Sequence, residues 1–229
     1  NYTKSENALA VTSGTAAIHL ALRVLGIKEG DDVLASTFTF IGSINAILYQ
    51  GANPIFIDSD KETWNLCPKL LNKYLCECEK KPKALIVTHL YGMCADIEKI
   101  ADICRLHGVY LIEDAAESLG SFYKNRHTGT FGKIGAFSFN GNKIITSGGG
   151  GVIVTDDESL AKRAKHITTT AKIPHPYEYV HDETAYNYRL PNINAALLVA
   201  QLEQLEKFLD SKRELAKIYK EFFLQNSIK

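Results

Sequence analysis

A lysine stands between two strand-like runs of the sequence, beside a glycine-rich turn. Lys143 follows the run 136–140 and precedes four consecutive glycines, Gly148 to Gly151, after which a second strand-like run covers 152–155. A lysine amine can form a Schiff base with a carbonyl when its surroundings free the neutral form, so Lys143 is a candidate covalent nucleophile. A solvated loop lysine is the alternative, and Lys143 taken alone does not exclude it.

Three further positions could serve the same chemistry. Asp114 follows the apolar run VYLI, so its carboxylate stands at the end of a strand, where ligands of α/β sheets gather; a structural cap is the alternative. Residues 13–16 (SGTA) open a helix whose free N–H groups suit a phosphate, although an ordinary N-cap explains them equally well. Phe40 falls where a strand leads into a helix, and its alternative is a place in the core.

None of these four features is specific by itself, but their order is informative. A phosphate-binding helix start, an aromatic ring, a strand-end Asp and a strand-flanked Lys are the parts needed to hold pyridoxal phosphate. The helix start would bind the phosphate, and the pyridine ring would be sandwiched. The Asp would keep the pyridine nitrogen protonated, and the Lys would carry the aldehyde as an imine. The sequence therefore predicts a pyridoxal phosphate site.

Helical and strand-like segments alternate along most of the chain, and this alternation predicts an α/β domain around a mostly parallel central sheet. Residues 171–184 are predicted to form an irregular surface loop. Residues 192–223 are predicted to form one long helix, with leucines on one face. The predicted strands cover 32–36, 54–58, 84–89, 109–112, 136–140 and 152–155, and the predicted helices before the loop cover 14–25, 39–50, 68–79, 96–107 and 157–170.

Composition excludes several classes of protein. The 229 residues are 45% hydrophobic, and 26 Lys and Arg balance 26 Asp and Glu, so the basic excess of a nucleic-acid or membrane-surface protein is missing. Without an apolar run of 18 residues or a signal-peptide pattern, we expect a cytoplasmic protein without a membrane partner. The five cysteines predict reduced thiols, and the histidines lack metal-ligand spacing, so no metal is expected. The chain begins at Asn1, which indicates a piece of a longer protein.

Several ordered blocks of the sequence resemble those of the DegT/DnrJ/EryC1/StrS sugar aminotransferases, a family with the aspartate-aminotransferase fold. So many blocks in order make the resemblance far more specific than one motif. Within the family, GNKIITSGGGG and SFYKN look most like the bacterial enzymes that aminate UDP-linked 4-keto-6-deoxy-N-acetylhexosamines. The blocks are SGTAAIHLAL (13–22), STFTFIGS (36–43), THLYG (88–92), IEDAAES (112–118), GTFG (129–132), FSFNGNK (137–143) and NYRLPNINAALLVAQL (187–202).

The resemblance implies a role for each matching residue. Lys143 matches the lysine that carries the cofactor, and Asp114 matches the partner of its pyridine nitrogen. Phe40 matches the aromatic residue stacked on the ring, and Glu117 stands where relatives place a side chain near the ring's 3-hydroxyl. The remaining matches bind phosphate: Gly14, Thr15 and Ala16 at the helix start, the hydroxyl of Ser138, and Asn187, which reaches the phosphate of the neighbouring subunit.

The resemblance also implies an architecture, a reaction and partners. Residues 1–190 would form the three-layer large domain of the aspartate-aminotransferase type (fold type I), which binds pyridoxal phosphate. Residues 191–229 would lead towards a small C-terminal domain that this chain lacks. The active unit would be a homodimer with two shared sites. The expected reaction moves an amino group from L-glutamate to the keto group, at C4, of a nucleotide-linked deoxysugar, with a UDP-sugar as the expected substrate.

Two other interpretations stay open. A related dehydratase uses the same cofactor, but in those relatives a His replaces the lysine, so Lys143 argues against it. A non-catalytic regulatory or scaffold protein that binds pyridoxal phosphate is the alternative from another class, because a shortened chain could bind the cofactor without turnover. The sequence also departs from many relatives at Asn140, Gly149 and Glu117, which changes the expected hydrogen bonding around the lysine.

Overall fold

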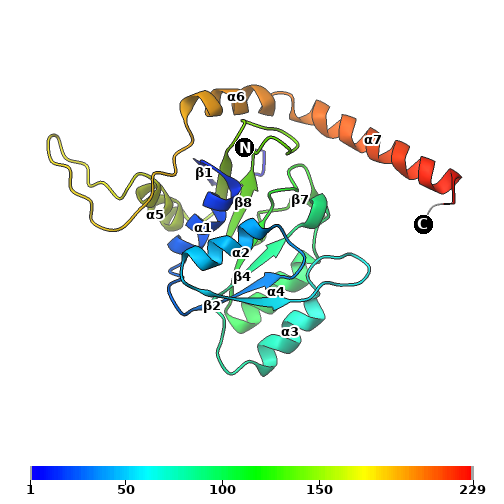
Figure 1. Ribbon diagram of the computed structural model, residues 1–229, viewed down its shortest axis with the longest axis horizontal. Coiled ribbons are helices and arrows are strands. Elements are labelled where there is room, and N and C mark those ends of the chain that lie inside the picture. Colours follow the sequence, from blue (N-terminus) through cyan, green and yellow to red (C-terminus); the bar gives the residue numbers. More distant parts are fainter. Residues whose placement is uncertain (1, 228–229) are drawn as a thin grey trace.

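A seven-stranded sheet forms the centre of the structure, a computed structural model that describes residues 2–227 (Figure 1). The strands lie in the order β1-β9-β8-β5-β4-β2-β3, and neighbours from β8 to β3 are parallel. β9 runs antiparallel to both β8 and β1. The bounds are β1 (Asn7–Val11), β2 (Asp32–Ser36), β3 (Asn53–Ile57), β4 (Ala84–Thr88), β5 (Tyr110–Asp114), β8 (Ile134–Ser138) and β9 (Gly151–Thr155); β6 (Phe122–Tyr123) and β7 (Arg126–His127) form a separate hairpin.

Helices cover both faces of the sheet. Buried residues of α1, α2 and α5 pack in one cluster with Ala84 and Ile86 of β4, and those of α3 and α4 pack with Leu85 and Val87 on the other face. Successive side chains of a strand point to opposite faces, which explains why β4 is apolar from Ala84 to Val87. The three-layer α/β fold predicted from the sequence is confirmed. The helices are α1 (Gly14–Val24), α2 (Ile41–Tyr49), α3 (Pro68–Glu77), α4 (Ile97–His107) and α5 (Glu158–Thr168).

The predicted long helix over 192–223 is wrong, because the structure has two helices there. α6 (Asn192–Leu202) and α7 (Leu205–Gln225) are separated by a tightened turn, in which the Gln204 N–H donates to the Gln201 carbonyl three residues back. Leu198 before the break and Leu209 after it stay buried in one cluster, while the chain changes direction around the body (Figure 1). Neither Gly nor Pro marks this break in the sequence. Within residues 2–227 no helix is long and apolar enough to cross a membrane.

Two further differences concern strands. No strand is predicted at β1 from the sequence. Its residues alternate between half-buried and exposed before the buried Val11, and they gain their order from pairing with β9. The strand predicted over 136–140 begins and ends two residues earlier, as β8. An edge strand that depends on a partner far along the chain leaves a weak local signal.

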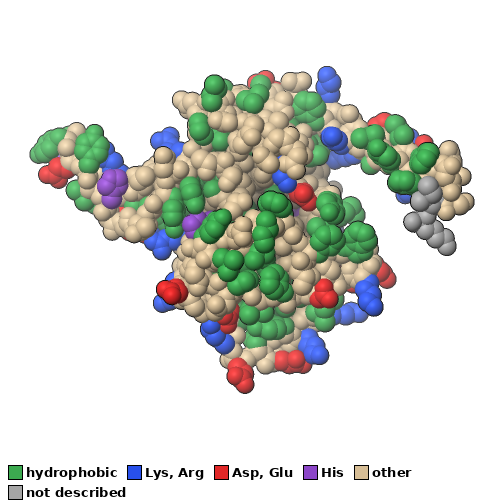
Figure 2. All heavy atoms as spheres, in the orientation of Figure 1, with side chains coloured by type: hydrophobic (Ala, Val, Ile, Leu, Met, Phe, Trp, Pro, Cys, Tyr) green, Lys and Arg blue, Asp and Glu red, His purple; other side chains and the backbone are tan. Residues whose placement is uncertain are grey.

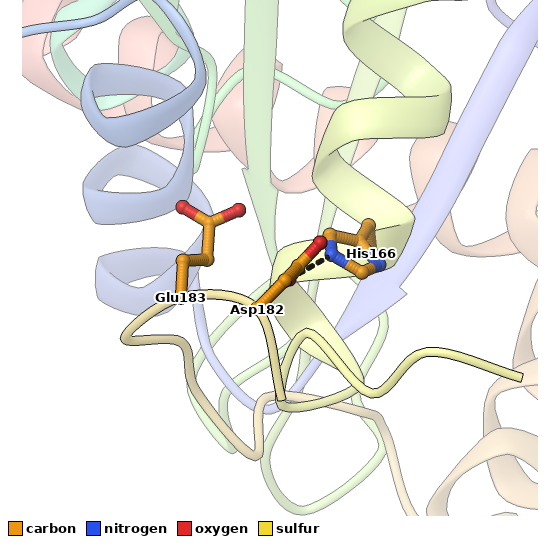
Figure 3. Close-up of side chains that lie close together, drawn as sticks. All are labelled: His166, Asp182 and Glu183. Atoms are coloured by element: carbon orange, nitrogen blue, oxygen red, sulfur yellow. Dashed lines mark hydrogen bonds and ion pairs between the residues drawn. The ribbon is translucent and has the colours of Figure 1, made fainter. Parts of the chain in front are cut away.

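The loop 171–184 is irregular, as predicted, and projects from the body (Figure 1). Ion pairs hold its base: Glu183 pairs with Arg163 and, at 3.2 Å, with Arg23, and His166 Nε2 lies 2.7 Å from Asp182 Oδ1. His166, Asp182 and Glu183 lie close enough to share a metal ion (Figure 3). Because two arginines already neutralise Glu183, we assign this cluster to the anchoring of the loop.

We expect Gly135→Ala to lower the free energy of unfolding by roughly 3 kcal/mol, since the new Cβ would overlap the carbonyl group of Gly129. Gly141→Ala is the control, because its new Cβ would meet no other described residue within 4 Å beyond its chain neighbours, and it should change stability by less than about 0.5 kcal/mol. Urea unfolding followed by circular dichroism measures both. Equal losses for the two variants would contradict this packing.

Candidate active site

A cleft of about 590 Å³ opens at the edge of the sheet where the parallel strands end. The carboxyl ends of β2, β4, β5 and β8 meet there, which is where ligands of α/β sheets bind. The loops that follow these four strands, together with the start of α1, form its walls. Among the lining residues are Gly14, Thr15, Phe38, Phe40, Ser43, Thr88, Tyr91, Asp114, Glu117, Ser138, Asn140 and Lys143.

The start of α1 offers backbone N–H groups to the cleft. The Ser13 hydroxyl accepts from the Ala16 N–H at 3.0 Å and caps the helix. Within the described part of the chain, the N–H groups of Gly14 and Thr15 donate no hydrogen bond. A Cβ on Gly14 would lie 2.8 Å from Cβ of Ser138, so only glycine lets the helix start approach this strand end. The free N–H groups of Gly14 and Thr15, together with the nearby hydroxyl of Ser138, therefore form a possible binding site for an anion.

Asp114 is a buried carboxylate held in one orientation. Its Oδ2 accepts from the Ser43 hydroxyl at 2.5 Å, and its Oδ1 accepts from the Ala116 N–H at 3.1 Å. Burial raises the pKa of the Asp114 carboxyl, while these two hydrogen bonds and the charge of Lys143 act in the opposite direction. An ionised carboxylate in this position would be stabilised by a cationic N–H donor in the cleft.

Lys143 faces the same cleft from the turn after β8. Its side chain is 18% exposed, and Nζ lies 3.5 Å from Oε1 of Glu117. The other oxygen of Glu117 accepts from the Tyr91 N–H at 2.9 Å, so one carboxylate contacts both the amine and the turn after β4. This partial burial disagrees with a fully solvated loop lysine and brings a primary amine into a cleft that also contains Asp114.

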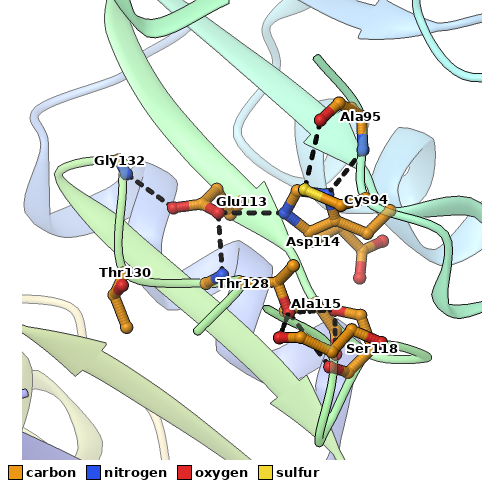
Figure 4. Close-up of polar contacts among 12 residues, drawn as sticks. Cys94, Ala95, Glu113, Asp114, Ala115, Ser118, Thr128, Thr130 and Gly132 are labelled. Atoms are coloured by element: carbon orange, nitrogen blue, oxygen red, sulfur yellow. Dashed lines mark hydrogen bonds and ion pairs between the residues drawn. The ribbon is translucent and has the colours of Figure 1, made fainter. Parts of the chain in front are cut away.

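A second buried carboxylate lies on the opposite face of β5 (Figure 4). Glu113 is fully buried and accepts from His89 Nε2 at 2.9 Å, from the Gly129 N–H at 2.7 Å and from the Gly132 N–H at 2.5 Å. Nδ1 of His89 accepts from the Ala95 N–H at 3.2 Å, so the ring proton is on Nε2. Glu113 thus fixes two loops next to the cleft without lining it.

The structure brings most of the predicted site residues together. Gly14, Thr15, Phe40, Asp114, Glu117, Ser138 and Lys143 all line the cleft. Phe40 is 72% exposed at its mouth rather than in the core. Ala16 is buried behind the helix start, where its N–H completes the Ser13 cap. Asn187 is exposed and pairs with Thr169 away from the cleft of its own chain, so its service to a neighbouring subunit stays a prediction.

Sequence reasoning gave no role to several residues of the cleft. The Ser43 hydroxyl donates a hydrogen bond to Asp114, which lies 71 positions later in the sequence. The hydroxyls of Thr39 and Thr88 form a hydrogen bond at 2.7 Å. Tyr91 lies at the mouth in the short 3-10 helix η1 (Leu90–Gly92). The only local signal for Ser43 is its place one helical turn after Phe40, which puts it on the same face of α2.

Comparisons with known proteins agree with one another. A model of the DegT/DnrJ/EryC1/StrS aminotransferase family matches residues 1–228. EpsN of Bacillus subtilis (strain 168), provisionally named a pyridoxal phosphate-dependent aminotransferase, is 49% identical over 93% of this chain and 55% of its own. The GDP-perosamine synthase of Escherichia coli O157:H7 is 47% identical over 93% of this chain and 57% of its own.

A crystal structure of a DegT DnrJ EryC1 StrS aminotransferase from Brucella abortus superimposes with a TM-score of 0.90 at 31% identity. The match covers 98% of this chain and 61% of that protein. The chain therefore spans little more than half the length of the relatives it matches, 55% of EpsN and 57% of the synthase.

Asp114→Asn should stabilise the unliganded protein in a pH-dependent way. A folded-state pKa raised above the ordinary 3.8 means that ionisation of Asp114 destabilises the fold. The penalty is absent at low pH, grows as pH rises through the raised pKa, and is complete above it. The gain in free energy of unfolding on substitution should follow the same course in urea titrations from pH 4.5 to 8. A gain that stays constant with pH, or a loss that grows with pH, would contradict this burial.

The two histidine–carboxylate pairs provide a matched test of burial. Glu113→Ala should lower the free energy of unfolding by about 3 kcal/mol or more, because it leaves His89 and two loop N–H groups buried without their acceptor. Asp182→Ala removes the carboxylate of the exposed pair with His166 and should leave stability close to that of the parent. Similar urea midpoints for the two variants would show that Glu113 is not the anchor described above.

Proposed function

The chain belongs to the DegT/DnrJ/EryC1/StrS aminotransferase family, and from this premise we propose that it is the cofactor-binding part of a sugar aminotransferase that uses pyridoxal phosphate. The observation that carries the proposal is that Lys143, Asp114 and the first residues of α1 all line the same cleft at the strand ends. Each of these groups could bind a different part of that one cofactor.

The residues of the cleft fit pyridoxal phosphate. The N–H groups of Gly14 and Thr15, with the hydroxyl of Ser138, would bind its phosphate. Asp114 would accept a hydrogen bond from the protonated ring nitrogen, whose positive charge would stabilise this buried carboxylate. Phe40 is an exposed ring at the mouth and would stack on the cofactor. When bound, pyridoxal phosphate supplies an electron-accepting ring that stabilises negative charge on the carbon bearing the amino group.

The chain's own residues divide the remaining work. Ser43 and the Ala116 N–H orient both oxygens of Asp114, whose charge would hold a proton at the ring nitrogen. Lys143 would hold the cofactor covalently through Nζ and, once displaced by L-glutamate, would take the proton from the α-carbon of that donor. Glu117 lies 3.5 Å from Nζ and would stabilise the ammonium group formed there. In amination of the keto sugar, Lys143 would carry out the same proton transfers in reverse.

The proposed acceptor is a keto group, at C4, of a nucleotide-linked deoxysugar. The sequence blocks around Lys143 favour a UDP-sugar, whereas a relative at 47% identity bears the name GDP-perosamine synthase and so supports a GDP-sugar. A panel of UDP-, GDP- and dTDP-linked 4-keto-6-deoxy sugars, offered with L-glutamate to the complete protein, decides between them.

A homodimer is the proposed active unit. Within the described residues, Lys143 is the one cation that lines the cleft, although both the cofactor and a nucleotide-linked sugar are anionic. A second copy could supply further groups, among them Asn187, which lies outside its own cleft. The first turn of α2 lines the cleft, and the apolar side chains of Ile41, Leu48 and Tyr49 on this helix are more than half exposed, so such a copy could cover them. Figure 2 shows hydrophobic side chains gathered over this part of the surface.

We also propose that residues 191–229 connect the large domain, 1–190, to a further domain of the complete protein. α7 projects from the body and exposes apolar side chains along its length, including Ile218, Tyr219 and Phe222 (Figures 1 and 2). A packed domain would bury this face.

Lys143→Ala should reduce amination of the keto sugar by roughly a thousandfold or more, because the nucleophile and the proton carrier are the same amine. The comparison is Lys162→Ala, which removes an exposed lysine of α5 and should keep the parent rate. Product formation from L-glutamate and the sugar panel gives the rates. Turnover of the Lys143 variant at the parent rate would rule out the mechanism. A yellow, cofactor-bound parent whose absorbance ignores L-glutamate would instead be the regulatory binder.

A further inference from the structure

Three aromatic side chains form a continuous surface at the mouth of the cleft, here called the aromatic rim: Phe38, Trp64 and Tyr91. The ring centroids of Phe38 and Trp64 are 6.1 Å apart, and those of Phe38 and Tyr91 are 6.2 Å apart. The residues are 42%, 57% and 70% exposed, respectively. Phe38 and Tyr91 line the cleft, and Trp64 extends the surface outward from Phe38. The rim therefore begins beside the reacting groups and ends outside the cleft.

The three segments that carry the rim are joined by hydrogen bonds. The Thr37 hydroxyl donates to Asp58 Oδ1 at 3.0 Å, which links the segment of Phe38 to the turn that contains Trp64. Asn65 is 3% exposed and links that turn to the segment of Tyr91. Its Oδ1 accepts from the Leu90 N–H at 3.0 Å, and its Nδ2 donates to the Met93 carbonyl at 3.3 Å. The three segments that carry the rings are thus linked to one another before any ligand arrives.

Two of the three rim residues have a left-handed backbone. The φ angles of Trp64 and Tyr91 are 61° and 51°, a region that bulky residues rarely adopt. The Trp64 N–H donates to the Asp60 carbonyl at 2.9 Å, and the Tyr91 N–H donates to Glu117 at the same distance. Strained backbone that holds large apolar rings in water is characteristic of binding sites rather than of ordinary loops.

We propose that the aromatic rim stacks the planar base of the nucleotide-linked substrate while the sugar end enters the cleft. The inference rests on the proposed function, because it assumes a nucleotide-linked sugar. The rim offers flat apolar faces and no charge, which suits a base and not a diphosphate. Stacking tolerates any base, since every base has a π-face, so the rim contributes affinity for the nucleotide and leaves the choice among bases to other groups. Through Glu117, Tyr91 also links the rim to Lys143.

The test uses the complete protein with its cofactor bound, and GDP and UDP as probes in calorimetric titrations. Trp64→Ala should weaken binding of both nucleotides about tenfold, and Trp64→Phe should restore affinity to within about twofold of the parent because it keeps a flat ring. Inorganic pyrophosphate, which lacks a base, should bind the parent and Trp64→Ala alike. Tyr110→Ala removes a 47% exposed aromatic residue at the opposite end of β5 and should leave all three affinities unchanged.

Fluorescence gives a second readout, because Trp64 is the single tryptophan of this sequence. GDP should quench an emission component that is missing in Trp64→Phe. The proposal is overturned if a folded Trp64→Ala variant binds GDP and UDP like the parent, if it loses pyrophosphate equally, or if sedimentation shows that it only shifts the monomer–dimer equilibrium. The absorbance of the parent with L-glutamate tests the proposed function separately. If that absorbance changes while Trp64→Ala binds nucleotides like the parent, the rim proposal is overturned and the proposed function is not.

Discussion

A charge buried at the end of a strand is the constraint on which the rest of this structure depends. Asp114 lies where β5 leaves the sheet, and a carboxylate there is unfavourable unless its oxygens and its charge have partners. Ser43 of α2 and the Ala116 N–H satisfy the oxygens, and the cation has to come from the cleft. The Ser43 hydrogen bond joins α2 to the end of β5, and the positive charge of Lys143 in the cleft favours the ionised form of Asp114. The same strand turns Glu113 to the opposite face, where it fixes the loops beside the cleft.

The sheet makes this arrangement possible because it is parallel in the middle and antiparallel at one side. Parallel strands bring four loops to one edge, and these loops supply the polar groups of the cleft. β9 reverses direction, so the glycine-rich turn before it passes the start of α1 at close range. A Cβ on Gly151 would overlap the Ser13 carbonyl, which explains why the turn ends in glycine. Helix start, lysine turn and aspartate are therefore neighbours through topology, although they are far apart in the sequence.

The sequence could predict the parts of this structure that have a local signature. The buried apolar run of β4 was sufficient to predict that strand, and the ordered blocks around Lys143 were sufficient to indicate the family. What it could not predict depends on contacts between distant residues. β1 is a strand because β9 lies beside it, and Ser43 matters because Asp114 is within reach. The break before Leu205 follows the shape of the body, and neither of the usual helix-breaking residues marks it.

The outer part of α7 has a consequence for the dynamics of the chain. Leu209 is its last buried residue, and every described residue from 210 onward is exposed. Arg213 still donates to the Gly120 carbonyl at 3.2 Å. Beyond it the described part of the helix is held by its own backbone hydrogen bonds, so it can open without disturbing the sheet. Its amide protons would then exchange with solvent through local fraying, many orders of magnitude faster than those of β4 and β5. The same protons would become protected once another surface covers this helix, which makes hydrogen exchange a direct reporter of what α7 contacts.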